Sequence, residues 1–118
     1  MSDESRFHDH ECRRFLGPEE KGLVTALIDK AGQLKLPAGW LDRVQVIPLD
    51  DGGMGSLRFL PSMEKGGRMG KQAAEVNFVD DDGVEVIVTL NLDEDGFPFE
   101  LDVWKTDFEP LVNGLKVP

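Results

Sequence analysis

The sequence of 118 residues is poor in the side chains that cross-link small proteins: it has one cysteine and two histidines. A single cysteine, Cys12, excludes an intramolecular disulfide, so apolar burial has to stabilise the fold. A chain of this length is expected to form one domain that buries roughly two-thirds of its unfolded surface. The sequence therefore predicts a single core without a disulfide.

Long apolar runs are also missing from the sequence. A membrane-spanning helix needs about 20 consecutive, mostly apolar residues, and a secretory signal needs a shorter apolar segment near its start. The sequence has neither of these segments. We therefore expect a soluble, cytoplasmic protein with no membrane partner.

The few metal-binding side chains gather near the N-terminus, where His8, His10 and Cys12 alternate with acidic residues. Imidazole and thiolate are good ligands for transition metals, so this cluster is one candidate metal site. A structural zinc site needs further ligands, and no second cluster follows along the chain. A solvated terminus is the simpler interpretation. We predict no metal site and no cofactor, and we expect residues 1–12 to form a disordered tail.

Basic residues are scarce in one third of the chain. Residues 74–111 contain 12 acidic residues and one basic residue, Lys105, so this part carries −11 and the remainder +1, for a net charge of −10. Phosphate neutralisation dominates the affinity for duplex nucleic acid, so the charge argues against nucleic-acid binding. It fits either a basic protein partner or a surface that charge keeps soluble.

The same region shows the clearest secondary-structure pattern. Residues 84–93 and 97–105 each alternate between apolar and mostly polar side chains, which is the period of a strand with one buried face. In the second segment the apolar face carries Phe97, Phe99, Leu101 and Val103. Both segments are typical of an antiparallel sheet with one covered side.

Two acidic turns ending in glycine set the expected register. We expect a three-residue loop at residues 81–83, with Gly83 in the left-handed region, and a four-residue loop at residues 93–96. Neither turn has the ligand spacing of a calcium-binding loop. The predicted pairs are Phe78–Val86, Val76–Val88 and Ala74–Leu90 in the first hairpin, and Leu92–Phe97, Leu90–Phe99, Val88–Leu101 and Val86–Val103 in the second.

The N-terminal half predicts one helix and further strands. Proline followed by two glutamates is a helix-start signal at residues 18–20, and apolar residues then recur at helical spacing up to residue 31. We expect strands at residues 44–49, 56–61 and 71–80, an irregular or short helical bridge at 34–41, and a loop at 62–70. The predicted fold is α+β: an N-terminal amphipathic helix packed on a meandering antiparallel sheet of about five strands. The domain covers residues 13–112, and residues 113–118 form a C-terminal tail.

The uncovered side of the predicted sheet is the candidate functional face. It mixes acidic, apolar and aromatic side chains, and such a face would suit a partner's arginine or lysine with Trp104 as an anchor. The alternatives are a plainly solvated face and a face covered by residues 34–41 or by a partner chain. The expected cross-strand rows are Glu75–Thr89–Glu100, Asn77–Ile87–Asp102 and Val79–Glu85–Trp104. The predicted binding residues are Glu75, Asn77, Thr89, Glu100, Asp102 and Trp104.

Catalytic patterns are weak. Glu100 and Asp102 share a strand face, and paired carboxylates act as acid and base when their pKa values are pushed apart. Nothing near them in the sequence supplies a nucleophile, a histidine or a metal cluster. The glycine-rich residues 52–55 lack the lysine and the following helix of a phosphate loop. We predict no catalytic residue, and a non-enzymatic role is favoured.

Three segments together resemble a family of small bacterial proteins of unknown function. They are the helix start at residues 18–20, DDGGMGSLRF at residues 50–59, and TLNLDEDGFPFELDVWKTDFEPL at residues 89–111. The ending ELDVWKTDFEPL is the most specific of them. It is similar, more loosely, to small acidic immunity proteins that neutralise bacterial toxins. The resemblance implies no catalytic residue.

The leading hypothesis is a non-enzymatic protein-binding module, of the immunity type if the looser similarity holds, that presents its acidic sheet face to a basic partner. The alternative is a small-molecule-binding or catalytic domain with a pocket beside the 62–70 loop. A homodimer joined through the exposed sheet face is a third hypothesis, so the sequence leaves both monomer and homodimer open.

Overall fold

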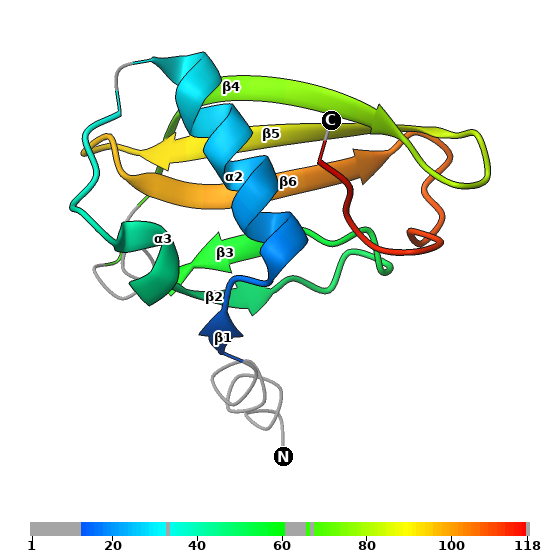
Figure 1. Cartoon of the computed structure of the whole chain (residues 1–118), viewed down its shortest axis with the longest axis horizontal. Coiled ribbons are helices and arrows are strands. Elements are labelled where there is room, and N and C mark those ends of the chain that lie inside the picture. The colour runs from blue at the N-terminus through cyan, green and yellow to red at the C-terminus, as the bar shows by residue number, and fades with distance from the viewer. Residues whose placement is uncertain (1–12, 33, 61–65, 67, 118) are drawn as a thin grey trace.

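The computed structural model describes residues 13–32, 34–60, 66 and 68–117. These residues form one antiparallel sheet, crossed on one face by helix α2 (Figure 1). The strand order across the sheet is β1-β2-β3-β6-β5-β4. In chain order the elements are β1 (Arg14–Phe15), α2 (Pro18–Ala31), α3 (Trp40–Arg43), β2 (Gln45–Pro48), β3 (Leu57–Phe59), β4 (Met69–Val79), β5 (Glu85–Asp93) and β6 (Pro98–Lys105).

The predicted α+β fold is confirmed, with six strands where about five were expected. The additional strand is β1, whose two residues pair with Val46 and Gln45 of β2. Two residues are too few to show an alternating pattern, so periodicity does not find this strand. None of the helices in the described part of the chain is long and apolar enough to cross a membrane.

Helix α2 begins and ends where the sequence predicts. The Glu20 carboxylate accepts a hydrogen bond from the Gly17 backbone N–H at 2.7 Å, which satisfies one of the free donors at the helix start. Gly32 ends the helix in the left-handed region at φ 78°, and its N–H donates to the Ile28 carbonyl at 3.1 Å. One stripe of apolar side chains, Leu23, Val24 and Leu27, is fully buried against the sheet.

The core lies between α2 and the near face of the sheet. It combines the stripe of α2 with inward-facing side chains of β2 to β6, and Trp40 and Leu41 of α3 pack against its edge. Burying this apolar surface is the main favourable term in the folding free energy. The strand residues of the core are Val46, Leu57, Phe59, Ala74, Phe78, Val86, Val88, Leu90, Leu92, Leu101 and Val103.

The hairpin between β4 and β5 has the predicted register. A three-residue loop is closed by hydrogen bonds from Asp80 N–H to the Val84 carbonyl and from Gly83 N–H to the Asp80 carbonyl, both at 2.9 Å. Gly83 has φ 82°, the left-handed conformation that this loop requires. The expected pairs Phe78–Val86, Val76–Val88 and Ala74–Leu90 are all present.

The predicted register of the hairpin between β5 and β6 is wrong by two residues. Asp93 N–H donates to the Phe97 carbonyl at 2.8 Å, so the loop has three residues and not four. A bulge then follows between the Asn91–Glu100 and Leu92–Pro98 pairs. Each change shifts the register by one residue, so Leu101 and Val103 keep the predicted inward face. Phe97 and Phe99 were predicted on the same face, but Phe97 is 40% exposed and Phe99 packs against Arg58. The observed pairs are Leu90–Leu101, Val88–Val103 and Val86–Lys105, where Leu90–Phe99, Val88–Leu101 and Val86–Val103 were expected.

Lys105 ends β6 on the buried face, and no part of it is exposed. Its ammonium lies 2.9 Å from the buried Asp80 carboxylate and 2.5 Å from that of Asp82, and it donates to the Pro110 carbonyl at 3.1 Å. Asp80 also accepts a hydrogen bond from Val112 N–H at 2.9 Å. One lysine therefore joins β6, the β4–β5 turn and the C-terminal segment.

The C-terminal segment, residues 110–117, folds back over the same face as α2 (Figure 1). Leu115 is 8% exposed and belongs to the core, and Leu111 is half-buried against it. Asn113 and Lys116 contact the Asp81 carboxylate. Most of the predicted tail is thus packed on the domain through Leu115 and held by the acidic turn.

Candidate functional site

The far face of the sheet has no covering helix among the described elements, because α2 and the core residues of α3 lie on the near face. Its half nearest the β4–β5 turn is open: Glu75, Asn77 and Asp102 are exposed, and Trp104 is 41% exposed. Thr89 is half-buried. Toward the opposite end the same face is closed, since Asn91 and Ile47 are at most 5% exposed.

The shifted β5–β6 register regroups the predicted rows on this face. Thr89 lies between Glu75 and Asp102, and Ile87 lies between Asn77 and Trp104. The predicted rows had Glu100 beside Thr89 and Asp102 beside Ile87, and these pairings are wrong. The site residues remain on one face because a shift of two residues changes the neighbours of a side chain and not the side of the sheet it occupies.

Glu100 is set apart from the other candidate residues. Its carboxylate accepts two hydrogen bonds from Arg58 of β3, at 2.7 and 3.2 Å, and the Arg58 guanidinium lies 4.5 Å from the centre of the Phe99 ring. Both side chains of the ion pair are less than one-third exposed. Glu100 is therefore neutralised within the protein and is a weaker candidate for an external cation than Asp102.

Asp102 forms no ion pair with any residue that the structure describes. Although the residue reaches solvent, partial burial of its carboxyl raises the pKa of Asp102, and the nearby negative charges of Glu100 and Asp51 raise it further. A raised pKa means that the ionised form lacks sufficient favourable partners. An external cation placed beside Asp102 would supply one.

An aromatic pair, Trp104 and Phe108, lies near Asp102 at the end of β6. The Trp104 and Phe108 rings lie 5.9 Å apart at an interplanar angle of 48°, and Phe108 is 68% exposed. Phe108 has φ 64°, a left-handed conformation that is costly for a bulky residue. A hydrogen bond from its N–H to the Lys105 carbonyl at 2.8 Å holds this turn. The end of β6 at the buried Lys105 thus positions an exposed aromatic ring.

Phe108 is a functional candidate that sequence reasoning missed. The alternation of β6 ends at Lys105, and no periodic pattern places the residues that follow it. The available signal was an apolar aromatic residue between two acids, Asp107 and Glu109, just after a strand. We define the surface formed by Glu75, Asn77, Ile87, Thr89, Asp102, Trp104 and Phe108 as the acidic–aromatic face.

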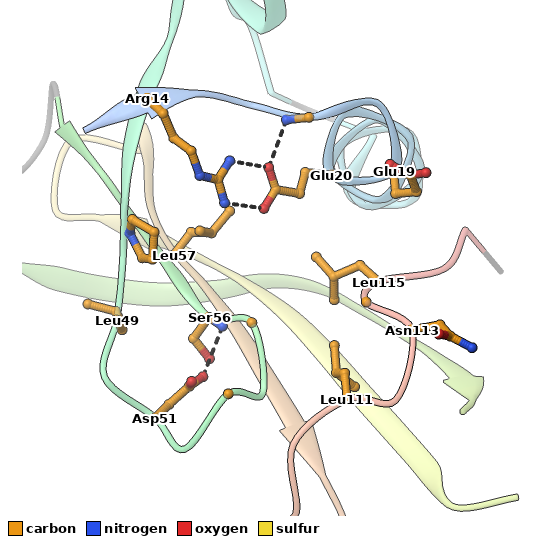
Figure 2. Close-up of a pocket in the computed structure, with 15 residues that line it drawn as sticks. Arg14, Glu19, Glu20, Leu49, Asp51, Ser56, Leu57, Leu111, Asn113 and Leu115 are labelled. Carbon is orange, nitrogen blue, oxygen red and sulfur yellow. Dashed lines mark hydrogen bonds and ion pairs between the residues drawn. The ribbon is translucent and has the colours of Figure 1, made fainter. Parts of the chain in front are cut away.

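A separate pocket of about 480 Å³ opens on the other side of the molecule. Figure 2 shows it between the Arg14–Glu20 pair, the β2–β3 loop with Asp51 and Ser56, and the C-terminal segment with Leu111 and Leu115. Arg14 donates to both carboxylate oxygens of Glu20, at 2.6 and 2.8 Å. None of its lining residues belongs to the 62–70 loop, beside which a pocket was predicted.

Parts of three predictions lie outside the described residues. The candidate metal cluster of His8, His10 and Cys12 is one, and most of the 62–70 loop is another. Near the end of that loop, a hollow of about 230 Å³ is lined by Lys71, Gln72 and Leu92 among others. The expected disorder of residues 1–12 stays a prediction. Within the described ranges, no group of three or more histidine, cysteine or acidic residues is placed to hold a metal ion.

Comparison with protein families gives one match. Residues 13–116 match the model of a family described as Domain of unknown function (DUF6984). The chain belongs to this family. The DUF6984 match covers every element from β1 to β6 and extends over Leu115, so the packed C-terminal segment falls within the family's domain. Comparisons with curated proteins and with solved structures found no significant match.

Proposed function

We propose that this DUF6984 domain is a non-enzymatic protein-binding module that uses the acidic–aromatic face to hold a basic segment of a partner protein. The observation that carries the proposal is the combination, on the sheet face that no described helix covers, of an Asp102 carboxylate without an ion pair among the described residues and the exposed Trp104–Phe108 pair. Exposed aromatic residues beside acids are suited to bind arginine or lysine, through cation–π contacts and charge.

The charge distribution supports a basic partner. Apart from Lys105, which is buried and already ion-paired, residues 74–111 carry only acidic charges. Complementary charge speeds association and discriminates against acidic competitors. The looser similarity to toxin-immunity proteins would make the partner a bacterial toxin, and it is one form of the same proposal.

The same charge disfavours a second copy of the chain as the occupant. A two-fold contact through the acidic–aromatic face would bring like charges together, which destabilises the pair. We therefore propose a monomer in the absence of the partner. Sedimentation at increasing protein concentration tests this point, and a dimer that Trp104→Ala dissociates would show that a second copy occupies the face.

Affinity capture from host lysate tests the proposal. The tagged protein should retain a basic protein at low salt and release it at high salt, because charge–charge attraction at an exposed surface is screened. Trp104→Ala and Asp102→Lys should each abolish the capture. Glu94→Lys makes the same charge change in the exposed β5–β6 loop at the other end of β6 and should leave capture intact. A partner retained equally by all variants would refute the proposal.

A further inference from the structure

Four leucine side chains contribute apolar walls to the pocket beside the start of α2. Leu49 and Leu57 come from the end of β2 and from β3, and Leu111 and Leu115 come from the C-terminal segment (Figure 2). A volume of about 480 Å³ falls within the usual range of small-molecule pockets, about 300–1,000 Å³. The walls would take the apolar body of a small ligand.

The polar groups of the pocket have an excess of negative charge. Three acids, Glu19, Glu20 and Asp51, line it together with a single cation, Arg14. Arg14 is committed to Glu20 through two short hydrogen bonds, so this pair is neutral as a unit. Glu19 and Asp51 form no ion pair with the described residues, and their two negative charges remain.

Asp51 is fixed in its ionised form. Burial alone would raise the pKa of Asp51, but hydrogen bonds from the Ser56 hydroxyl and from backbone N–H groups of Ser56, Met54 and Gly55 outweigh it and lower the pKa. These donors are neutral groups, so they hold the carboxylate in place without cancelling its charge. The potential inside the pocket therefore favours a cation.

The C-terminal segment forms one wall of the pocket and is held by several contacts. Leu111 N–H donates to the Gly53 carbonyl at 3.1 Å, and Val112 N–H donates to Asp80 at 2.9 Å. Lys116 is held by Asp81 through a partly exposed ion pair. Together with Leu115 in the core, these contacts hold the wall beside the pocket.

We propose that this pocket binds a small organic amine, with the protonated nitrogen at Asp51 and the apolar body against Leu57, Leu111 and Leu115. The pocket is separate from the acidic–aromatic face, although the charge of Asp51 also acts on Asp102.

Titration of the full chain with 2-phenylethylamine, followed by amide NMR, tests the proposal. Phenylacetate, which has a similar shape and the opposite charge, is the matched probe. The amine should shift the amides of Ser56, Leu57 and Leu115 in a saturable way at millimolar concentrations, about 1–10 mM. Phenylacetate should leave these amides unchanged.

Two variants test which carboxylate attracts the amine, and a third variant is the control. Asp51→Asn should weaken amine binding by about three- to ten-fold, because it removes the charge at the amine end of the pocket, whereas Glu19→Gln changes a carboxylate at the opposite end and should weaken binding less. Asp95→Asn removes an exposed acid from the β5–β6 loop and should leave the affinity unchanged. Equal shifts with phenylacetate, amine-induced shifts only at Thr89 and Trp104, or equal affinity in all three variants would each overturn the assignment.

Discussion

At the scale of single residues, the most consequential side chain is Lys105. Alternation along β6 places it on the buried face directly after Val103, and it is fully buried there with two carboxylates. Removing one member of a buried ion pair leaves the other charge without compensation, which is strongly destabilising. The sequence predicted the inward side of this position but not that a charge would occupy it as the link between three segments.

Lys105→Met tests that link. The substitution keeps the apolar stem of the side chain and removes the ammonium, so the buried Asp80 carboxylate loses its cation. We expect the midpoint of thermal unfolding to fall by about 10 °C or more. Lys71→Met, at an exposed position of β4, is the control and should change the midpoint little. Equal midpoints for the two variants would show that Lys105 is not structurally important.

Asp102→Asn tests the electrostatics of the acidic–aromatic face. The pKa of Asp102 is raised by partial burial and by Glu100 and Asp51, so its ionised form costs stability at neutral pH. That cost disappears below the pKa of the unfolded chain, about 3.9, where the carboxyl is protonated in both states. Asp102→Asn should therefore raise the unfolding midpoint at pH 7, by only about 1–2 °C because solvent screens the charge. Near pH 3 the substitution should leave the midpoint unchanged. A lower midpoint at pH 7 would contradict the assignment.

At the scale of elements, the two hairpins show how much of the strand register can be predicted from the turn residues. In the β4–β5 hairpin, an acidic turn ending in Gly83 and the matching of apolar residues gave the loop length and the three predicted pairs. In the β5–β6 hairpin, a similar turn was followed by a bulge beside Pro98, which breaks the regular pairing. Alternation carries no information about this bulge. It therefore predicts which strand residues share the acidic–aromatic face, but not which of them are neighbours, and it does not place Phe108.

Gly83→Ala measures the strain that the first hairpin avoids. Gly83 has φ 82°, and no atom lies within 4 Å of the position that an alanine Cβ would take. Any loss of stability therefore comes from the backbone conformation alone. We expect a loss of about 1 kcal/mol in the free energy of unfolding by urea titration. Gly83→Asn should cost less, because asparagine tolerates the left-handed region better. Equal stability of Gly83→Ala and the unchanged protein would refute the loop geometry.

At the scale of the whole molecule, sequence patterns predicted the α+β class, α2 and the buried face, but not the C-terminal packing. Leu115 lies in the core although the segment before it shows no periodic pattern. The segment is held by Val112 and Asn113, which contact Asp80 and Asp81, about 30 residues earlier in the chain. Such long-range polar contacts have no local signature. The pocket escaped prediction for the same reason, because this segment forms one of its walls.

Acid sensitivity follows from the same long-range contacts. Burial would raise the pKa of Asp80, but the Val112 N–H and Lys105 outweigh it and lower the pKa; the pKa of Asp82 is lowered chiefly by Lys105. Groups with lowered pKa values stabilise the fold above the unfolded value, about 3.9, and this stabilisation is lost as the pH falls through the folded values. The urea midpoint should be nearly constant from about pH 7 to 5 and fall below about pH 4. A midpoint that rises on acidification below pH 4 would contradict this.

The measurement that tests the central claim most directly is the fluorescence of Trp104 during titration with an arginine-rich peptide. Trp40→Phe leaves Trp104 as the only tryptophan and keeps an aromatic ring beside Phe59. We predict a saturable change at low salt that weakens at high salt, weakens in Phe108→Ala, and is absent when glutamine replaces arginine in the peptide. An unchanged signal, or the same signal with the glutamine peptide, would contradict the claim that the acidic–aromatic face binds a basic partner.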